Sequence, residues 1–351
     1  MSFSSHGGYR GAVAKDVPRK PLELLTQGFQ QFRVLATAVD LRLFSLLPAR
    51  GAAVPDVASM LGFEERPTRI LLTALISMGL LEKRGPRYRT TPLSRTYLVE
   101  GRPAYYGDFV QMMDRRLYDA YRHLDRSLRT NRPVTADPAI GDLFRTMAQD
   151  PAMVRLFTSG MHATGTYWAD ALAKSYDFSR HRVLLDVGGG SGIYAITIAK
   201  HHRRLRATVF DLPGVLEMAR EKIREAGLES RITTVAGDFF KDEWPRDADV
   251  VVFSAILHDW PPEISRTLLR KAADILPKGG AVVIRELFMN DDGLGPLYAA
   301  MSSVTMLLDT EGENYSWATY ESWLQEAGFH RFRRIPFRTT AASGALVAHK
   351  R

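Results

Sequence analysis

The stretch VLLDVGGGSG, residues 183–192, decides the fold of this 351-residue chain. Its first half is a short, mostly apolar run, which is typical of a β-strand buried on both faces of a sheet. Gly188, Gly190 and Gly192 follow at alternate positions. Glycine lets the backbone turn sharply and approach a ligand without a Cβ in the way. We therefore expect a strand, a tight glycine loop and a helix whose first N–H groups face a ligand.

The spacing of these glycines separates two kinds of nucleotide-binding loop. A dinucleotide site of the form G-x-G-x-x-G uses its third glycine for close packing of the helix on the strand. In this chain that position holds Ile193, and the pattern is G-x-G-x-G instead. The spacing therefore disfavours NAD as the ligand, although a glycine loop by itself is a weak signal.

Strands and helices alternate along the chain after residue 182. Such alternation predicts an α/β fold with a Rossmann-like, doubly wound and mostly parallel sheet. Ligands of these sheets bind at the carboxyl ends of the strands. We expect further strands over residues 207–210, 232–235, 250–253 and 281–285, and helices over residues 193–201, 215–226 and 263–276.

The N-terminal part follows a helical period instead. Apolar residues recur at three- and four-residue steps from Leu22 to Leu43, which predicts a helix with one buried stripe. Helices expected over residues 55–61 and 65–78 precede a strand, a tight turn and a second strand within residues 79–90. Helix, turn, helix and hairpin is the order of a winged helix.

We expect the chain to be organised in four segments. A helical segment rich in methionine and aromatic residues separates the winged helix from the sheet. Such side chains build adaptable apolar pockets, so we expect this segment to contribute to a substrate pocket as well as to the core. The predicted segments are a loose tail (1–20), the winged helix (21–100), the helical segment (101–178) and the sheet domain (179–351).

Polar residues follow successive predicted strands. Asp211 and Asp238 follow the second and third strands, and the sequence LHDWP, residues 257–261, follows the fourth. Because the carboxyl ends of parallel strands meet at one edge, we expect these residues to face one crevice. An acid after the second strand can accept hydrogen bonds from both hydroxyls of a ribose. Asp238 can take an adenine amino group while Phe239 packs against the ring.

With these motifs the sequence resembles the S-adenosylmethionine-dependent O-methyltransferases of the plant caffeate and hydroxyindole type and their bacterial relatives. The resemblance covers about residues 20–350, and residues 185–192, 210–213, 237–240 and 257–261 carry it. The Asp-Leu-Pro and His-Asp-Trp segments are its specific parts. The resemblance implies S-adenosylmethionine as the cofactor and a winged-helix domain used for forming a homodimer.

The resemblance also implies roles for individual residues. His258 is the catalytic base, and Glu286, at the end of the fifth strand, orients it. The family's second acid falls at Asn314, which can hydrogen-bond an imidazole but cannot offset the charge of an imidazolium. The neighbouring Glu313 is an alternative partner. The implied cofactor site comprises Gly188, Gly190, Asp211, Leu212, Asp238, Phe239, Ser254, Asp259 and Met161.

The chemistry of histidine suits this role. A phenol or enol hydroxyl, with a pKa of about 10, is a poor nucleophile while it is protonated. A histidine can take that proton as the methyl group moves to the oxygen, and this scheme needs no metal. We therefore predict an O-methyltransferase that acts on a small aromatic or polyketide-like natural product. The candidate acceptor-binding residues are Met112, Phe157, Met301 and Met306.

Composition limits the kinds of site, the partners and the cellular location that we expect for this activity. The chain has no cysteine, which excludes disulfides, thiolate metal sites and a cysteine nucleophile. Its net charge of +8 is mild for 351 residues. Its apolar stretches fall short of the roughly 20 residues that span a bilayer. The first 20 residues lack the apolar core of a signal peptide. We expect a cytoplasmic homodimer without a membrane or nucleic-acid partner.

Two other functions are weighed against this one. Arg66 and Arg69 on the second helix of the winged helix, with a basic hairpin, suit phosphate contacts, so a DNA-binding regulator is the alternative from another class. The departure at Asn314 leaves room for N- or C-methylation, or for a non-methylating use of the cofactor. Binding to duplex DNA and transfer of a labelled methyl group distinguish these functions.

Overall fold

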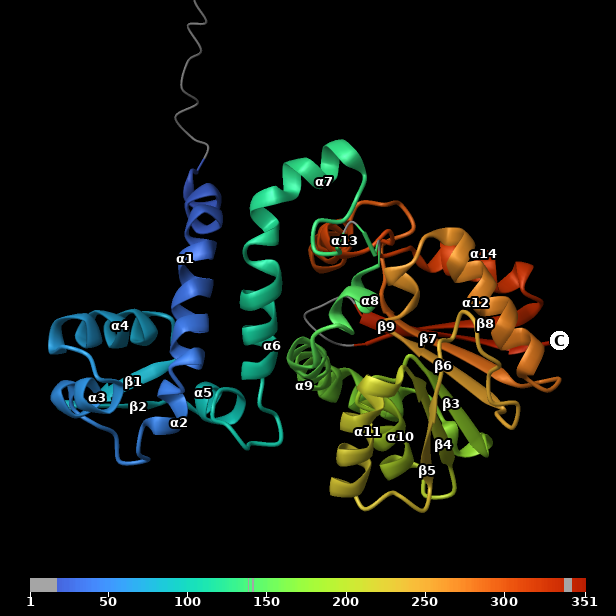
Figure 1. The fold of residues 1–351 in the computed structure, drawn as a ribbon, viewed down its shortest axis with the longest axis horizontal. Helices are drawn as coiled ribbons and strands as arrows, with labels where there is room; N and C mark the ends of the chain where they lie inside the picture. The colour runs from blue at the N-terminus through green and yellow to red at the C-terminus, as the bar shows by residue number, and fades with distance from the viewer. Residues whose placement is uncertain (1–17, 138, 141, 338–342) are drawn as a thin grey trace, which may run out of the picture. The chain divides into compact units, whose positions relative to one another are not determined.

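The computed structural model describes residues 18–137, 139–140, 142–337 and 343–351. Its contacts divide the chain into two compact units, residues 1–91 and residues 92–351, which Figure 1 colours from blue to red along the chain. Most of the tail expected over residues 1–20 lies outside the described residues. This division does not test the segment boundaries expected at residues 20, 100 and 178, which stay a prediction.

The first unit has the element order of a winged helix, as predicted. An antiparallel hairpin follows the helices, and its pairing runs from Leu81 with Thr90 to Arg84 with Arg87. A bridge between Ala52 and Tyr88 ties the preceding chain to this hairpin. The elements are α1 (Lys20–Asp40), α2 (Leu43–Leu46), α3 (Val54–Leu61), α4 (Glu65–Ser77), β1 (Leu81–Arg84) and β2 (Arg87–Thr90).

The buried stripe predicted along α1 is correct only in its second half. Ala36 and Val39 are buried, but Leu22, Leu25 and Phe29 are 64%, 77% and 59% exposed in the single chain. Periodicity shows which side chains share a helix face, and it does not show what covers that face. The first turns of α1 therefore present an apolar face to the surroundings of the unit.

The second unit contains the predicted sheet. Its strands are β3 (Val183–Val187), β4 (Arg206–Asp211), β5 (Ile232–Ala236), β6 (Val250–Ser254), β7 (Ala281–Leu287), β8 (Phe329–Pro336) and β9 (Ser343–Lys350). They lie in the order β5-β4-β3-β6-β7-β9-β8. The first five in this order are parallel, whereas β9 pairs with β7 and β8 in antiparallel fashion. The doubly wound, mostly parallel fold is confirmed, and the antiparallel edge adds to it.

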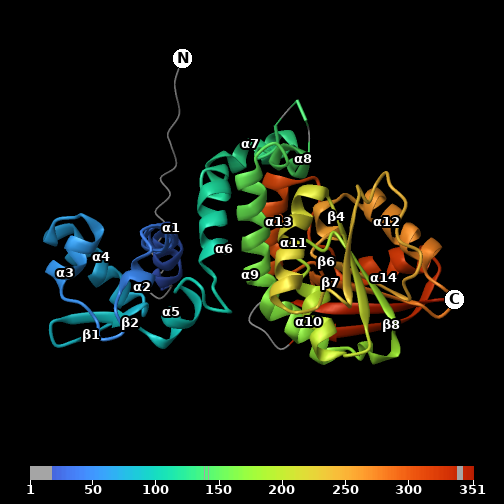
Figure 2. The same ribbon diagram turned by 60° about the horizontal axis from the view of Figure 1, so that its bottom comes forward.

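Helices cover both faces of this sheet, as Figure 2 shows. One face carries α9 (Pro151–Ser175), α10 (Ile193–His201) and α11 (Pro213–Glu225), and the other carries α12 (Pro262–Ile275) and α14 (Trp317–Glu326). Leu184 packs in the first core and its neighbour Leu185 in the second. This follows because successive side chains of a strand point to opposite faces.

The remaining helices of the second unit are short, apart from one that follows the last parallel strand. Among the described residues, no helix combines the length and apolar composition that crossing a bilayer requires. The remaining helices of the second unit are α5 (Pro92–Tyr97), α6 (Gly107–Met112), the π-helical turn η1 (Met113–Leu117), η2 (Ala120–His123), α7 (Leu124–Thr130), α8 (Leu143–Met147), η3 (Phe178–Arg180), η4 (Leu257–Asp259) and α13 (Leu297–Asp309).

Candidate active site

The glycine loop between β3 and α10 adopts the backbone that its sequence predicts. Gly188, Gly190 and Gly192 have φ of +65°, +58° and +74°, a region that side chains with a Cβ rarely adopt. A Cβ on Gly188 would lie 2.4 Å from Cδ1 of Ile256. A Cβ on Gly190 would meet nothing within 4 Å. The loop is therefore packed at Gly188 and leaves space for a ligand at Gly190, and we call it the glycine cradle.

Asp211, at the end of β4, holds this loop. One carboxylate oxygen accepts a hydrogen bond from the N–H of Gly190 at 2.8 Å, and the other accepts from the N–H of Leu212 at 2.7 Å. Burial raises the pKa of Asp211 to about 6, although both hydrogen bonds favour the charged form. The structure thus brings together three of the predicted cofactor residues, Gly190, Asp211 and Leu212.

Asp238 and Phe239 follow β5 at the same edge. The Asp238 carboxylate accepts a hydrogen bond from the N–H of Phe240 at 2.9 Å and lies 3.5 Å from the Lys241 ammonium. It is therefore engaged in its own turn. The Phe239 ring lies 3.5 Å from where a Cβ of Gly188 would be, so its edge borders the cradle.

His258 lies in η4, directly after β6, between two carboxylates. Its Nδ1 is 2.5 Å from Oε2 of Glu286, and Oε1 of Glu286 accepts from the N–H of Ile256 at 3.1 Å. Its Nε2 is 3.5 Å from Oδ1 of Asp259. Since an imidazole that donates Nδ1–H to Glu286 has its lone pair on Nε2, that nitrogen is the one able to take a proton.

The two carboxylates control the charge of this imidazole. Burial alone lowers the pKa of His258, but the charges of Glu286 and Asp259 outweigh it and raise the pKa to about 9. Burial raises the pKa of Asp259 to about 7, and the nearby His258 opposes that shift. His258 is therefore held mainly as the imidazolium at neutral pH in the free protein.

Asn314 is buried, but the structure turns its side chain toward α13. With its amide oxygen placed as acceptor, Asn314 accepts from the N–H of Ser303 at 3.1 Å and from the Ser302 hydroxyl at 2.9 Å. Its amide nitrogen then donates to the Leu287 carbonyl at 3.0 Å. No hydrogen bond joins Asn314 to His258 in the described structure, so the proposed partnership stays a prediction. The alternative partner Glu313 is exposed.

The loop after α13 nevertheless packs directly against the backbone of His258. A Cβ on Gly312 would lie 2.1 Å from the backbone oxygen of His258. Only a residue without a side chain allows this approach. The Tyr315 hydroxyl also donates to the carbonyl of Trp260 at 2.8 Å. The segment that carries Asn314 therefore fixes the backbone of η4 through Gly312 and Tyr315, independently of the Asn314 side chain.

A buried ion pair ties α13 to the helical segment before the sheet. Arg116 Nη2 lies 2.6 Å from Asp309 Oδ2, with the two side chains only 8% and 1% exposed. The Thr135 hydroxyl donates to the other Asp309 oxygen at 2.8 Å. The Arg116 guanidinium also lies 5.2 Å from the centre of the Phe157 ring. This pair borders the active site, because its charges act on Asp259.

The other predicted residues lie on the surrounding helices. Met301 and Met306 are on α13, and Met301 is 48% exposed. Met112 is buried, and its side chain packs against Gly160 of α9. Met161 is half-buried on α9, and Ser254 ends β6 in line with the glycine loop. Their contacts with a cofactor or acceptor stay a prediction.

Sequence reasoning missed three residues of this site. His162 of α9 places Nδ1 2.8 Å from the Ser191 hydroxyl in the glycine loop. Burial lowers the pKa of His162 to about 4, so it is neutral. Neither His162 nor the pair Arg116 and Asp309 belongs to a local motif. The one available signal was an acid, Asp309, closing an apolar helix.

A cavity of about 440 Å³ opens beside these groups. Asp259 and Asp309 line it, with the aromatic rings of Phe144, Phe240 and Trp260. Within the described residues, no three His, Cys, Asp or Glu side chains are grouped to hold a metal ion. The edge of the sheet thus combines a backbone cradle, a buried base and an aromatic cavity.

Comparison with known proteins supports this arrangement. A family model described as the O-methyltransferase domain matches residues 121–330, and one described as the O-methyltransferase dimerisation domain matches residues 23–100. The 3-hydroxy-5-methyl-1-naphthoate 3-O-methyltransferase of Streptomyces sahachiroi is 40% identical over 93% of this chain and 94% of its own. The L-tyrosine C(3)-methyltransferase of Streptomyces lavendulae is 34% identical over 92% of this chain and 90% of its own.

A solved structure shows the same architecture throughout. Human N-acetylserotonin methyltransferase, crystallised in complex with SAM, superposes with a TM-score of 0.88 at 29% identity. The match covers 97% of this chain and 99% of the human one. Two domain models and a relative at 40% identity agree in the family that they indicate. The chain therefore belongs to the O-methyltransferase family.

Proposed function

We propose that this O-methyltransferase transfers the methyl group of S-adenosylmethionine to a hydroxyl of a small aromatic or polyketide-like natural product, with His258 as the general base. The observation that carries the proposal is the buried His258–Glu286 pair beside the glycine cradle. The relative that methylates a hydroxynaphthoate supports an aromatic acceptor. We also propose a homodimer in the cytoplasm, with the exposed apolar face of α1 as part of its interface.

The residues at the strand ends fit S-adenosylmethionine. The open backbone at Gly190 admits a ligand, and the Asp211 carboxylate beside it suits the ribose hydroxyls. The Phe239 ring borders Gly188 and offers a flat apolar surface to an adenine. Leu212, Asp238, Asp259, Met161 and Ser254 complete the proposed site. When bound, the cofactor supplies an electrophilic methyl group on a sulfonium.

His258 acts as the base through Nε2, the ring nitrogen that Glu286 does not contact. Glu286 fixes the ring by its contact with Nδ1, so Nε2 takes the proton of the acceptor hydroxyl. Asp259 lies on the same side and stabilises the imidazolium that results. We assign acceptor binding to Met301, Met306, Phe157 and Met112, and Asn314 to the support of α13 against η4.

Transfer of label from S-adenosylmethionine tests the proposed function. We expect hydroxynaphthoates and related phenols to gain a labelled methyl group on oxygen, with S-adenosylhomocysteine formed in equal amount. Mass spectrometry of the product locates the methyl group. Label on carbon or nitrogen would support the alternative acceptors instead, which the tyrosine C-methylating relative keeps in view. Product without label would contradict methyl transfer.

Substitution of Asp211 should weaken cofactor binding. In Asp211→Ala the N–H groups of Gly190 and Leu212 lose their shared acceptor, and the ribose hydroxyls lose theirs. Hydrogen bonds to a charged group are worth about 1.5–3 kcal/mol, so we expect S-adenosylhomocysteine to bind roughly 10- to 100-fold more weakly. Calorimetric titration measures this change. Glu217 is exposed on α11, so Glu217→Gln removes one charge elsewhere and should leave the affinity unchanged.

The rate should rise with pH up to about 9. His258 must be neutral to accept a proton, and its pKa is raised to about 9, so only a small fraction of it is neutral at pH 7. We expect kcat/KM to climb about tenfold per pH unit below that value and to level off above it. In Glu286→Gln one of the two charges that raise the pKa of His258 is gone, so the profile should shift to lower pH while its plateau falls. A profile independent of pH between 6 and 9 would contradict the assignment.

A further inference from the structure

The glycine cradle is flexible by composition, so it needs fixed points to keep one shape. Residues 188–192 are all glycine except Ser191, the one residue of this stretch that carries a side chain. Glycine loses more conformational freedom on folding than any other residue. Asp211 supplies one fixed point by accepting a hydrogen bond from the N–H of Gly190 at 2.8 Å. The side chain of Ser191 supplies another.

Ser191 is held by His162, which lies on α9. Its hydroxyl is 2.8 Å from Nδ1 of His162, and Ser191 is only 3% exposed. In the described structure this hydroxyl has no other hydrogen bond. Because a buried hydroxyl without a partner costs free energy, the position of the imidazole determines where Ser191 lies.

The imidazole of His162 is neutral, which suits its place beside the cradle. Burial lowers the pKa of His162 to about 4. A neutral imidazole has one N–H and one lone pair, and a hydroxyl can donate or accept, so the bond to Ser191 forms with either tautomer. A neutral ring also adds no positive charge next to the proposed site of a cofactor whose sulfonium is itself positive.

His162 reaches the loop from a helix that is fixed in place. A Cβ on Gly165 would lie 2.8 Å from Cγ2 of Ile193, so α9 is in direct contact with the first residue of α10. Nearer its amino end, α9 is joined to α11 by the ion pair of Arg155 and Glu221 at 3.1 Å. Arg155 and His162 are seven residues apart and therefore share one face of the helix. This face of α9 is the support from which His162 holds Ser191.

We propose that His162 is a positioning residue for S-adenosylmethionine, which holds Ser191 so that the backbone of the glycine cradle keeps the shape that receives the cofactor. Asp211 and His162 fix two adjacent residues of the loop, Gly190 and Ser191, from β4 and from α9. The inference rests on the proposed cofactor site at the cradle. His162 has no part in the proton transfer assigned to His258, so its loss acts on cofactor binding rather than on the chemical step.

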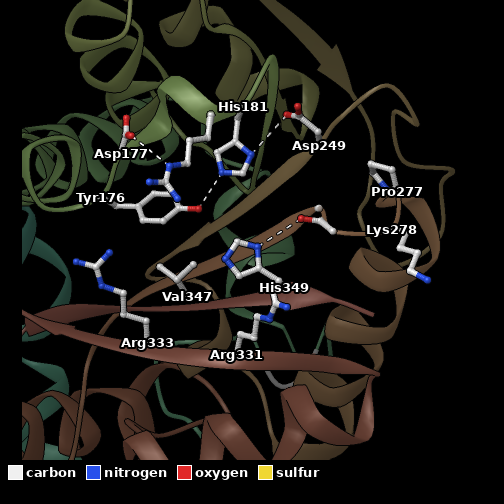
Figure 3. A pocket seen from close by; sticks show the side chains of 13 residues that line it. Tyr176, Asp177, His181, Asp249, Pro277, Lys278, Arg331, Arg333, Val347 and His349 are labelled. Carbon is white, nitrogen blue, oxygen red and sulfur yellow. Dashed lines mark hydrogen bonds and ion pairs between the residues drawn. The ribbon is translucent and has the colours of Figure 1, made fainter.

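A similar pair at the other end of the sheet provides a matched control. His181 precedes β3, and its Nε2 lies 2.8 Å from the Tyr176 hydroxyl, as Figure 3 shows. Burial lowers the pKa of His181 as well. This pair borders a cavity of about 600 Å³ at the amino ends of the parallel strands, whereas the glycine cradle lies at their carboxyl ends. Loss of its hydrogen bond should therefore leave cofactor binding unchanged.

Calorimetric titration of the full-length protein with S-adenosylhomocysteine tests the proposal. We expect His162→Leu and Ser191→Ala each to bind it roughly tenfold more weakly, the scale of one lost hydrogen bond. The double variant should bind no more weakly than either single variant, because both changes remove the same bond. His162→Asn should stay within about twofold of wild type, since asparagine carries a polar atom as many bonds from the backbone as Nδ1 is. Tyr176→Phe, the matched control, should also stay within about twofold.

Kinetics distinguish positioning from a general loss of structure. In His162→Leu we expect the KM for S-adenosylmethionine to rise about as much as the affinity falls, while kcat at saturating cofactor stays near that of wild type. Partial unfolding would instead lower kcat and the melting temperature and leave KM unchanged, which would overturn the proposal.

Two binding results would also overturn it. One is wild-type affinity in His162→Leu, and the other is a pair of losses that multiply to roughly a hundredfold in the double variant. Asp211→Ala shows which idea has failed. Weaker binding in Asp211→Ala beside unchanged binding in His162→Leu removes only the positioning role, whereas unchanged binding in both contradicts the cofactor site itself.

Discussion

Replacing His258 with alanine should lower kcat by roughly 10²–10⁴-fold, the usual contribution of a positioned general base. The imidazole is oriented by a buried carboxylate at Nδ1, which leaves Nε2 as the nitrogen able to take a proton. Without it, the acceptor hydroxyl must lose its proton to water. Initial rates with a labelled methyl donor at saturating acceptor measure the loss.

A binding measurement and a control variant test whether the loss of activity comes from the His258 imidazole itself. The affinity of His258→Ala for S-adenosylhomocysteine should match that of wild type, because in the described structure no hydrogen bond or ion pair joins this side chain to the glycine loop or Asp211. His123→Ala, on exposed η2, removes a histidine elsewhere and should keep full activity. Turnover near the wild-type rate in His258→Ala would remove His258 from the mechanism.

Replacing Asp309 with asparagine should destabilise the second unit by about 3–5 kcal/mol. This is the usual cost of leaving one member of a buried ion pair without its partner. Nη2 of Arg116 has Asp309 as its partner, while its Nε and Nη1 are buried without hydrogen bonds, so the guanidinium depends on this carboxylate. The loss should appear in urea unfolding monitored by tryptophan fluorescence.

An exposed pair from the same region provides the control. Arg132 and Glu311 lie 3.1 Å apart with side chains 75% and 51% exposed, so Arg132→Gln should cost at most about 1 kcal/mol. Removing both buried charges, as Arg116→Met with Asp309→Leu, should recover most of the stability that Asp309→Asn loses. If Asp309→Asn unfolds at the same urea concentration as wild type, the pair does not stabilise the unit.

Local chemistry explains which features the sequence predicted. Gly188, Gly190 and Gly192 stand where the backbone requires a positive φ, so their spacing specified the loop directly. The buried parallel strands were predicted because their continuous apolar runs leave few other structures open. Asp211 followed from its place at a strand end, and the structure puts it in contact with the loop.

The features that sequence reasoning missed depend on distant partners. The edge strand β8 contains HRFRRIP, in which charged residues and a bulge hide the period-two pattern of a strand. Arg116 and Asp309 are 193 residues apart, and no local motif joins them. The resemblance makes Asn314 a partner of His258, which stays a prediction, and the structure adds hydrogen bonds between its amide and Ser302, Ser303 and Leu287. Which of two nearby groups a side chain meets is decided by packing.

The proposed proton-accepting pair and the proposed acceptor-binding residues belong to different parts of the fold. His258 lies in η4 after β6 and Glu286 lies near the end of β7, both interior strands of the sheet, while Met301 and Met306 are carried by α13. Exchanges along one face of α13 can therefore give descendants of this enzyme new substrates while the reaction itself is inherited intact. Libraries limited to that helix are the economical route to altered selectivity.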